Sequence, residues 1–225
     1  MLEKTERTAL WLDTFEREIR AIEDRSGLPV DKWRVGGRAS KQWPNREDAA
    51  FWREEGLRQF EAYIEWLDKS GWKIATMPDD KPGIEWEAEV WFGGTPVRMV
   101  VDAIYDVNGD WVVVDYKTGS RTPEWEMQIS LYASALERVY GKRPKWGAYY
   151  MTRKAALSDL SSLERFGMDW FDYAFSTMNF MVDNDILPAH VGDHCGYCSV
   201  SEWCAAVNPQ SDKAQQYPII KGDKG

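Results

Sequence analysis

The sequence is poor in cysteine and histidine and has no long apolar run. Its 225 residues include 3 cysteines and 2 histidines. An odd number of thiols cannot pair completely, and so few exclude a secreted domain held together by disulfides. No segment approaches the roughly 18 consecutive apolar residues that a membrane helix needs, and no signal-peptide core follows the first residues. We therefore expect a cytoplasmic protein with no membrane partner.

The chain also has no excess of basic over acidic residues. The chain has 28 Lys and Arg against 37 Asp and Glu, a formal net charge of −9. This balance argues against an indiscriminate nucleic-acid binder, because such a protein gains its affinity by neutralising phosphates. Any contact with DNA must then come from local basic stretches. An apolar share of 44% and a charged share of 29% are ordinary for a globular domain and exclude a disordered chain.

Hydrophobic periodicity predicts two helices followed by three strands. Apolar residues spaced three and four apart predict helices over residues 8–23 and 47–69. Alternation then predicts strands over residues 84–92, 97–105 and 111–116. On the first of these strands we expect the apolar side chains to face one way: Ile84, Trp86, Ala88, Val90 and Phe92.

The second half of the chain predicts a return to helices. Gly93-Gly94 and Asn108-Gly109 predict tight turns between the three strands. Thr122-Pro123-Glu124 predicts a helix start, with a hydroxyl cap and proline at the first position. A strand over residues 145–151 and one or two helices within residues 159–184 follow. This order favours an α/β fold with a mixed sheet.

We expect four regions along the chain. They are an N-terminal helical region (1–77), a core with its following helices (78–188), a cysteine-rich segment (189–208) and a flexible tail (209–225).

Carboxylates and one lysine gather on the predicted strands. Asp115 and Lys117 are two residues apart on a strand, so both project from the same face of the sheet. Asp102, on the neighbouring strand, can meet them. An isolated Asp-x-Lys on a strand is common, but converging carboxylates beside a lysine suit a hard divalent cation bound through oxygen. The lysine would then lie near the attacking water or the scissile phosphate.

A third carboxylate and two polar helix residues complete the pattern. Glu85, Glu87 and Glu89 alternate along the first strand, and each could supply the third acid or belong to a solvated edge. We favour Glu85 because it directly follows the turn at Pro82-Gly83. On the next helix Gln128 and Tyr132 are four residues apart, so they share a face at the rim of this site.

Three segments in this order carry a family resemblance: Val101-Asp102-Ala103, Val114-Asp115-Tyr116-Lys117-Thr118-Gly119 and Gln128-Ile129-Ser130-Leu131-Tyr132. The sequence resembles the RecB-type branch of the PD-(D/E)XK nuclease superfamily over residues 78–204. The stretch from Arg34 to Arg38 is similar to phage-encoded exonucleases of this branch. The resemblance implies a restriction-endonuclease-like core, a mixed sheet flanked by helices, with a C-terminal Cys-rich metal-binding loop.

The resemblance also implies a chemistry. It implies a Mg²⁺- or Mn²⁺-dependent exonuclease that hydrolyses DNA in phage recombination, repair or replication, in the cytoplasm of a bacterial host. A recombination or replication protein would be its partner. Six residues would form the catalytic site: Glu85, Asp102, Asp115, Lys117, Gln128 and Tyr132. Asp102, Asp115 and the carbonyl of Tyr116 would hold the cation, and Lys117 would orient water or stabilise the developing charge. Many relatives carry a metal-binding histidine on the preceding helix, and residues 47–69 contain none.

The cysteines form a separate motif. Cys195, Cys198 and Cys204 lie within ten residues, and the two-residue gap between the first two lets both thiolates reach one metal. Related nucleases place three such cysteines after the core and a fourth before it, and together these hold an iron–sulfur cluster. Here the fourth is absent. A zinc site with His194, a cluster with a non-cysteine ligand and three unlinked thiols remain alternatives.

Two basic stretches are candidates for DNA contact, against the alternative that they only keep the protein soluble. The residues are Arg34, Arg38, Lys142, Arg143 and Lys145. Two rival functions also remain. One is a catalytically idle, metal-stapled subunit that binds DNA or a partner through the nuclease fold. The other is a small zinc-binding interaction protein with surface carboxylates.

Overall fold

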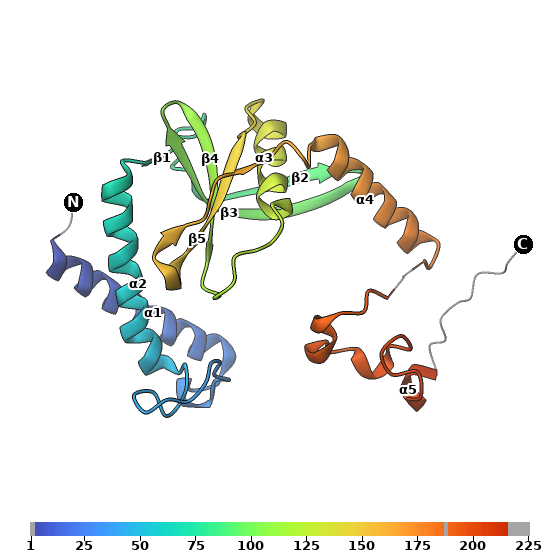
Figure 1. Cartoon of the computed structure of the whole chain (residues 1–225), viewed down its shortest axis with the longest axis horizontal. Coiled ribbons are helices and arrows are strands. Elements are labelled where there is room, and N and C mark those ends of the chain that lie inside the picture. The colour runs from blue at the N-terminus through green and yellow to red at the C-terminus, as the bar shows by residue number, and fades with distance from the viewer. Residues whose placement is uncertain (1–2, 187–188, 216–225) are drawn as a thin grey trace, which may run out of the picture. The chain divides into compact units, whose positions relative to one another are not determined.

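The computed structural model describes residues 3–186 and 189–215 (Figure 1). The chain divides into two compact units, residues 1–173 and residues 174–225, and each is described by itself. Within the described residues, no helix is both long enough and apolar enough to cross a bilayer.

Two helices open the first unit, and both were predicted. Helix α1 spans Lys4–Ser26 and α2 spans Ala49–Ser70, with the short 3₁₀ turn η1 at Val30–Lys32 between them. Asp48 caps α2, because its Oδ1 accepts a hydrogen bond from the Phe51 N–H at 2.9 Å. Gly56 lets α1 approach closely, since a Cβ there would lie 2.2 Å from the ring of Trp11.

A mixed sheet forms the centre of the unit. Its strands are β1 Lys73–Ile74, β2 Ile84–Phe92, β3 Thr95–Val107, β4 Asp110–Lys117, β5 Trp146–Met151, β6 Ala156–Leu157 and β7 Ser161–Ser162. The order is β1-β3-β4-β5-β6, with β2 also on β3 and β7 also on β5. Only β4 and β5 run parallel among these pairs. The predicted mixed sheet is confirmed. Both predicted tight turns are confirmed as well, with positive φ angles at Gly93-Gly94 and at Asn108-Gly109.

Helix α3, Met127–Tyr140, connects the parallel strands β4 and β5. The expected cap at Thr122 is wrong by four residues, because Glu126 occupies the cap position. The segment before α3 is held instead to β5, because the Tyr149 hydroxyl donates to the Trp125 carbonyl at 2.8 Å. This tertiary contact outweighs the local preference for a helix start. The 3₁₀ turn η2, Thr152–Lys154, follows β5.

Two further expectations need correction. Ile84 is 49% exposed and does not share the buried face of Trp86, Val90 and Phe92. The neighbouring Glu85 has φ of +47°, which interrupts the alternation of an extended strand. In the region after β5, a helix fills only Met168–Asp183 (α4) of the predicted 159–184.

Strand β4 is buried on both faces, where Val112, Val113 and Val114 follow one another. One face packs under α2, with Tyr105, Val112 and Val114 in the core beside Tyr63 and Trp66. The other face lies under α3, where Ile129, Ala133 and Leu136 are fully buried.

Three tyrosine hydroxyls form a closed ring of hydrogen bonds in the layer between α2 and the sheet. The O–O distances are 2.7 Å between Tyr63 and Tyr105, 3.0 Å between Tyr63 and Tyr116, and 2.7 Å between Tyr105 and Tyr116. Burial raises the pKa of the Tyr105 and Tyr116 hydroxyls well above the ordinary value.

The second unit contains the end of α4 and short turns. These are the 3₁₀ turns η3 (Asp193–Tyr197) and η4 (Ser201–Trp203) and the helix α5 (Asp212–Gln215). In the range 174–213, no side chain that the structure describes is fully buried. The predicted flexible tail falls partly on α5, and its residues from 216 onward lie outside the described residues.

Candidate active site

The sheet register places three predicted acids in one row across β2, β3 and β4. Ile84 pairs with Ala103 and Trp86 with Val101, so Glu85 lies opposite Asp102. Ala103 pairs with Val114, and one step further along the two strands Asp102 comes opposite Asp115. The row crosses the sheet at the point where β3 and β4 stop pairing.

Asp102 occupies the opening between β3 and β4. Its Oδ2 accepts a hydrogen bond from the backbone N–H of Tyr116 at 2.7 Å. This N–H is thus satisfied by a side chain rather than by the neighbouring strand. The contact fixes one Asp102 oxygen against β4.

Asp115 is the most unusual group in the site. It is 3% exposed, and its Oδ2 is fully buried. The ammonium of Lys117 lies 2.7 Å from Oδ2 and forms an ion pair with it. Burial raises the pKa of Asp115, and the nearby charge of Asp102 raises it further, while Lys117 opposes both. A buried carboxylate favours positive charge beside it, and Lys117 supplies one such charge.

A chain of polar contacts orients Lys117. Its Nζ donates to Gln128 Oε1 at 2.9 Å, and Gln128 Nε2 donates to the Tyr132 hydroxyl at 2.8 Å. Burial is the main cause that raises the pKa of Tyr132, and Asp115 and Asp102 add to it. Four of the predicted residues, on β4 and α3, are thereby brought together.

Tyr149 belongs to this site although sequence reasoning missed it. It pairs with Asp115 in the parallel register, and its ring centroid lies 5.7 Å from Lys117 Nζ. Burial and then the charge of Asp115 raise its pKa to about 12. Knowing that β4 and β5 pair in parallel would have identified Tyr149. Hydrophobic periodicity does not show which strands pair.

Glu85 lies in the same row as Asp102 and Asp115, but it does not share their partly or fully buried surroundings. It is exposed, and its positive φ turns the backbone at this point out of the extended form. Glu87, the neighbouring alternative, accepts a hydrogen bond from Arg98 Nε at 2.7 Å. Within residues 3–186 and 189–215, no group of three or more Asp, Glu, His or Cys side chains is arranged to hold a metal.

Two carboxylates nevertheless fit a divalent cation of the Mg²⁺ type. Such ions bind through one or two carboxylates and keep water and substrate phosphate as their other ligands. Asp102 and Asp115 supply this number, and the strand register places them opposite each other.

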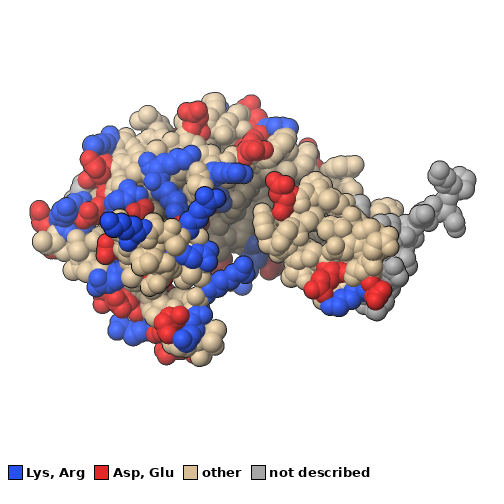
Figure 2. Space-filling model, turned by 60° about the horizontal axis from the view of Figure 1, so that its bottom comes forward, with Lys and Arg blue, Asp and Glu red and all other residues tan. Residues whose placement is uncertain are grey.

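The predicted DNA-contact residues differ in their surroundings. Arg34, Arg38 and Lys145 are exposed. Arg143 instead donates to Ser134, to Glu137 and to two backbone carbonyls, so its guanidinium is used within the fold. Lys142 donates to the Gly109 carbonyl at 3.1 Å. Basic side chains gather over part of one face, with acidic side chains along its margins (Figure 2).

The cysteine segment is not gathered into a metal site. Cys195, Cys198 and Cys204 are free and partly buried. Cys195 Sγ accepts a hydrogen bond from the Gly192 N–H at 3.4 Å. His194 Nε2 lies 2.8 Å from the His190 carbonyl. Among the described residues, these side chains are not gathered around a common centre that could hold a metal ion.

Comparison with known proteins completes this picture. A family model described as the PD-(D/E)XK nuclease superfamily matches residues 7–205. The chain belongs to this superfamily. The match extends from α1 of this PD-(D/E)XK protein to its cysteine segment, so it includes the carboxylates, the lysine and the polar helix residues described above.

Two phage proteins are similar to this PD-(D/E)XK chain. The Gene 69 protein of Mycobacterium phage D29 is 32% identical over 155 residues, which are 66% of this chain and 57% of the relative. The Gene 69 protein of Mycobacterium phage L5 is 29% identical over 174 residues, 66% of this chain and 60% of the relative. The matches thus span about three-fifths of the length of these relatives.

Proposed function

We propose that this chain is a divalent-metal-dependent DNA exonuclease of the RecB-type branch, encoded by a phage and used in recombination, repair or replication of its DNA. The observation that carries the proposal is the buried Asp115 carboxylate, which lies beside Lys117 and opposite Asp102. Membership in the PD-(D/E)XK nuclease superfamily and the similarity to two phage proteins support it.

Asp102 and Asp115 are the side chains that would hold Mg²⁺ or Mn²⁺, with the Tyr116 carbonyl as a further ligand. When bound, such an ion supplies Lewis-acid activation of the phosphate and of a water molecule. The same charge would compensate the cost of keeping the Asp115 carboxylate ionised in its buried position, since burial raises its pKa. Asp102 is oriented by the hydrogen bond that its Oδ2 accepts from the Tyr116 N–H.

Lys117 would act on the phosphate or on the attacking water. Its ammonium cannot bind a cation, but its positive charge stabilises the negative charge that develops on the phosphate oxygens. Gln128 holds Nζ in place, and Tyr132 in turn holds Gln128. The two helix residues therefore limit the positions that the lysine can take, which is the condition for effective electrostatic stabilisation.

DNA would be contacted by local basic residues despite the net charge of −9. The exposed Arg34, Arg38 and Lys145 suit this role, because their guanidinium and ammonium groups face solvent. Arg143 suits it less, since its donors are used within the fold.

We also propose that the cysteine segment takes up a structural metal, zinc or an iron–sulfur cluster. The basis is the three thiols within ten residues. Ligand side chains on short loops can gather when the metal binds, because metal binding and local folding are coupled.

The experiment that tests the main proposal compares end-labelled linear DNA with closed circular DNA, each with Mg²⁺, Mn²⁺ or EDTA. We expect linear DNA to be shortened from its ends with either metal and to survive in EDTA, and circular DNA to survive throughout. Cutting of the circular form would replace the exonuclease assignment by an endonuclease. Binding of DNA with no cutting under any condition would favour the catalytically idle subunit.

A further inference from the structure

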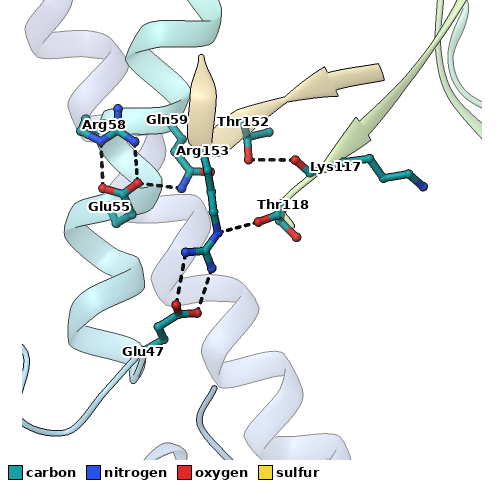
Figure 3. A network of polar contacts seen from close by, with 8 residues as sticks. All are labelled: Glu47, Glu55, Arg58, Gln59, Lys117, Thr118, Thr152 and Arg153. Atoms are coloured by element: carbon teal, nitrogen blue, oxygen red, sulfur yellow. Dashed lines mark hydrogen bonds and ion pairs between the residues drawn. The ribbon is translucent and has the colours of Figure 1, made fainter. Parts of the chain in front are cut away.

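The end of β4 is held by the turn that follows β5. The ladder between these strands ends at the pair Lys117–Met151. Beyond it, the Thr152 hydroxyl donates to the Lys117 carbonyl at 3.4 Å, and Arg153 Nε donates to the Thr118 carbonyl at 2.6 Å (Figure 3). Side chains thus continue to fix the backbone at and just after Lys117, where the strand pairing has stopped.

Arg153 forms a bidentate ion pair with Glu47. Its Nη1 and Nη2 donate to Glu47 Oε1 and Oε2 at 3.2 and 2.8 Å (Figure 3). Its guanidinium also lies over the ring of Trp52, 5.0 Å from the centroid. The two charged side chains are only 29% and 21% exposed, so water screens their attraction incompletely. The side chain that reaches Thr118 therefore has little freedom.

Glu47 connects this contact to the loop that carries the exposed arginines. Its backbone N–H donates to the Gly36 carbonyl at 3.3 Å. Gly37 has φ of +69°, and a Cβ on it would lie 2.4 Å from Glu47 Cγ. The loop containing Arg34 and Arg38 is thus packed directly against the carboxylate that holds Arg153.

We propose that Arg153 is a positioning residue for DNA cleavage, which fixes the backbone that carries Lys117 and couples it through Glu47 to the basic loop. The inference rests on the proposed nuclease function. Arg153 acts here without touching DNA or metal, because its three guanidinium nitrogens are directed to protein groups. A displacement of about 1 Å in a reacting group can cost roughly a hundredfold in rate. Loss of Arg153 should therefore lower kcat and leave DNA affinity nearly unchanged.

Arg138 provides a matched control. Its Nη1 and Nη2 reach Asp172 Oδ1 and Oδ2 at 3.2 and 2.7 Å, and it stacks on Phe92 with 4.7 Å to the ring centroid. The two charged side chains are 31% and 38% exposed. The pair has the same chemistry as Arg153 and Glu47, but it ties α3 to the start of α4 instead of holding the end of β4.

The experiment measures three quantities for the full-length wild type, Arg153→Gln and Arg138→Gln. They are kcat with saturating linear DNA and Mg²⁺, the Kd for the same DNA in EDTA, and the melting temperature. We expect Arg153→Gln to lose roughly ten- to a hundredfold in kcat with Kd changed by less than about twofold. Arg138→Gln should melt at a lower temperature but keep its kcat.

Two further variants keep the test informative if Arg153→Gln folds poorly. Arg153→Lys retains the charge on a single donor nitrogen, so its kcat should be intermediate. Glu47→Gln leaves the Arg153 bond to Thr118 but replaces the ion pair by a neutral hydrogen bond, so its kcat should also be intermediate. A wild-type kcat in these variants with weaker DNA binding would overturn the proposal, as would an equal loss of kcat in Arg138→Gln. A wild type that cuts no DNA would instead overturn the nuclease function on which the proposal rests.

Discussion

The carboxylate site and the cysteine segment were both predicted as metal sites, but their side chains are positioned by different kinds of backbone. Asp102, Asp115 and Lys117 lie on paired strands, and helix α3 adds its two polar residues within hydrogen-bond distance. The thiols lie on short 3₁₀ turns and the loops between them, where no described cluster of ligands forms.

This difference shows what backbone hydrogen bonding alone can place. A strand register fixes the positions of its side chains whether or not a ligand is present, because the ladder and the buried core determine it. A loop has no comparable constraint. Its ligand side chains converge only when the free energy of metal binding offsets the conformational entropy that the loop loses. The carboxylate site is thus assembled by the fold, whereas the metal site that we propose at the cysteines would form only with its metal bound.

The largest expected effect tests the assembled site. Asp115→Asn and Lys117→Ala should each lower DNA cleavage by about a hundredfold or more, because they remove a cation ligand and a charge aimed at the phosphate. Asp110→Asn, on the same strand but exposed, is the control and should cleave normally. Retention of full activity by either site variant, measured on end-labelled DNA, would refute the assignment of this site.

The second effect tests the ligand-dependent site. Protein purified without oxygen should contain zinc or iron in near-stoichiometric amount, and Cys198→Ser should lose this metal and melt at a lower temperature. Ser199→Ala is the neighbouring control and should keep both. Elemental analysis and an absorption band at about 400 nm distinguish a cluster from zinc. Absence of any metal, together with an unchanged melting temperature in Cys198→Ser, would leave the thiols as ordinary structural residues.

A smaller effect tests how far the row of acids extends. Glu85→Gln should lower the cleavage rate several-fold, because Glu85 lies opposite Asp102, while Glu89→Gln should have less effect. Steady-state rates at equal Mg²⁺ measure the difference. An equal or reversed ranking would move the third acid along β2, and no loss in either variant would limit the site to two carboxylates.

The smallest expected effect concerns the stability of the metal-free protein. Because burial raises the pKa of Asp115 in the folded state, ionisation of this carboxyl costs folding free energy at pH above that pKa. In EDTA, Asp115→Asn should therefore melt a few degrees higher than the wild type at neutral pH. The gain should shrink as the pH falls and disappear below about 3.9, the ordinary pKa of Asp, where the carboxyl is protonated in both states. A variant that melts lower at neutral pH would show that the ion pair with Lys117 outweighs the burial cost.

Much of the fold and most of the candidate site could be predicted from local patterns. Residues two apart on a strand and four apart on a helix share a face, which was enough to group Asp115 with Lys117 and Gln128 with Tyr132. Other features depend on contacts that are distant in sequence. The start of α3 is set by the bond between Tyr149 and Trp125, and Arg153 lies 106 residues from Glu47. The turned backbone at Glu85 has no signal in the alternation around it.

The ring of tyrosine hydroxyls between α2 and the sheet provides an intrinsic absorbance probe for the packing of α2. Exposed tyrosines ionise near pH 10 and absorb more strongly in the near ultraviolet as phenolates. Tyr105 and Tyr116 keep their protons beyond that range while α2 covers the sheet. In an alkaline titration Tyr105 and Tyr116 should therefore add no phenolate absorbance while α2 is packed on the sheet. Their absorbance should appear when α2 separates from the strands. The separation can be followed in unlabelled protein by absorbance alone.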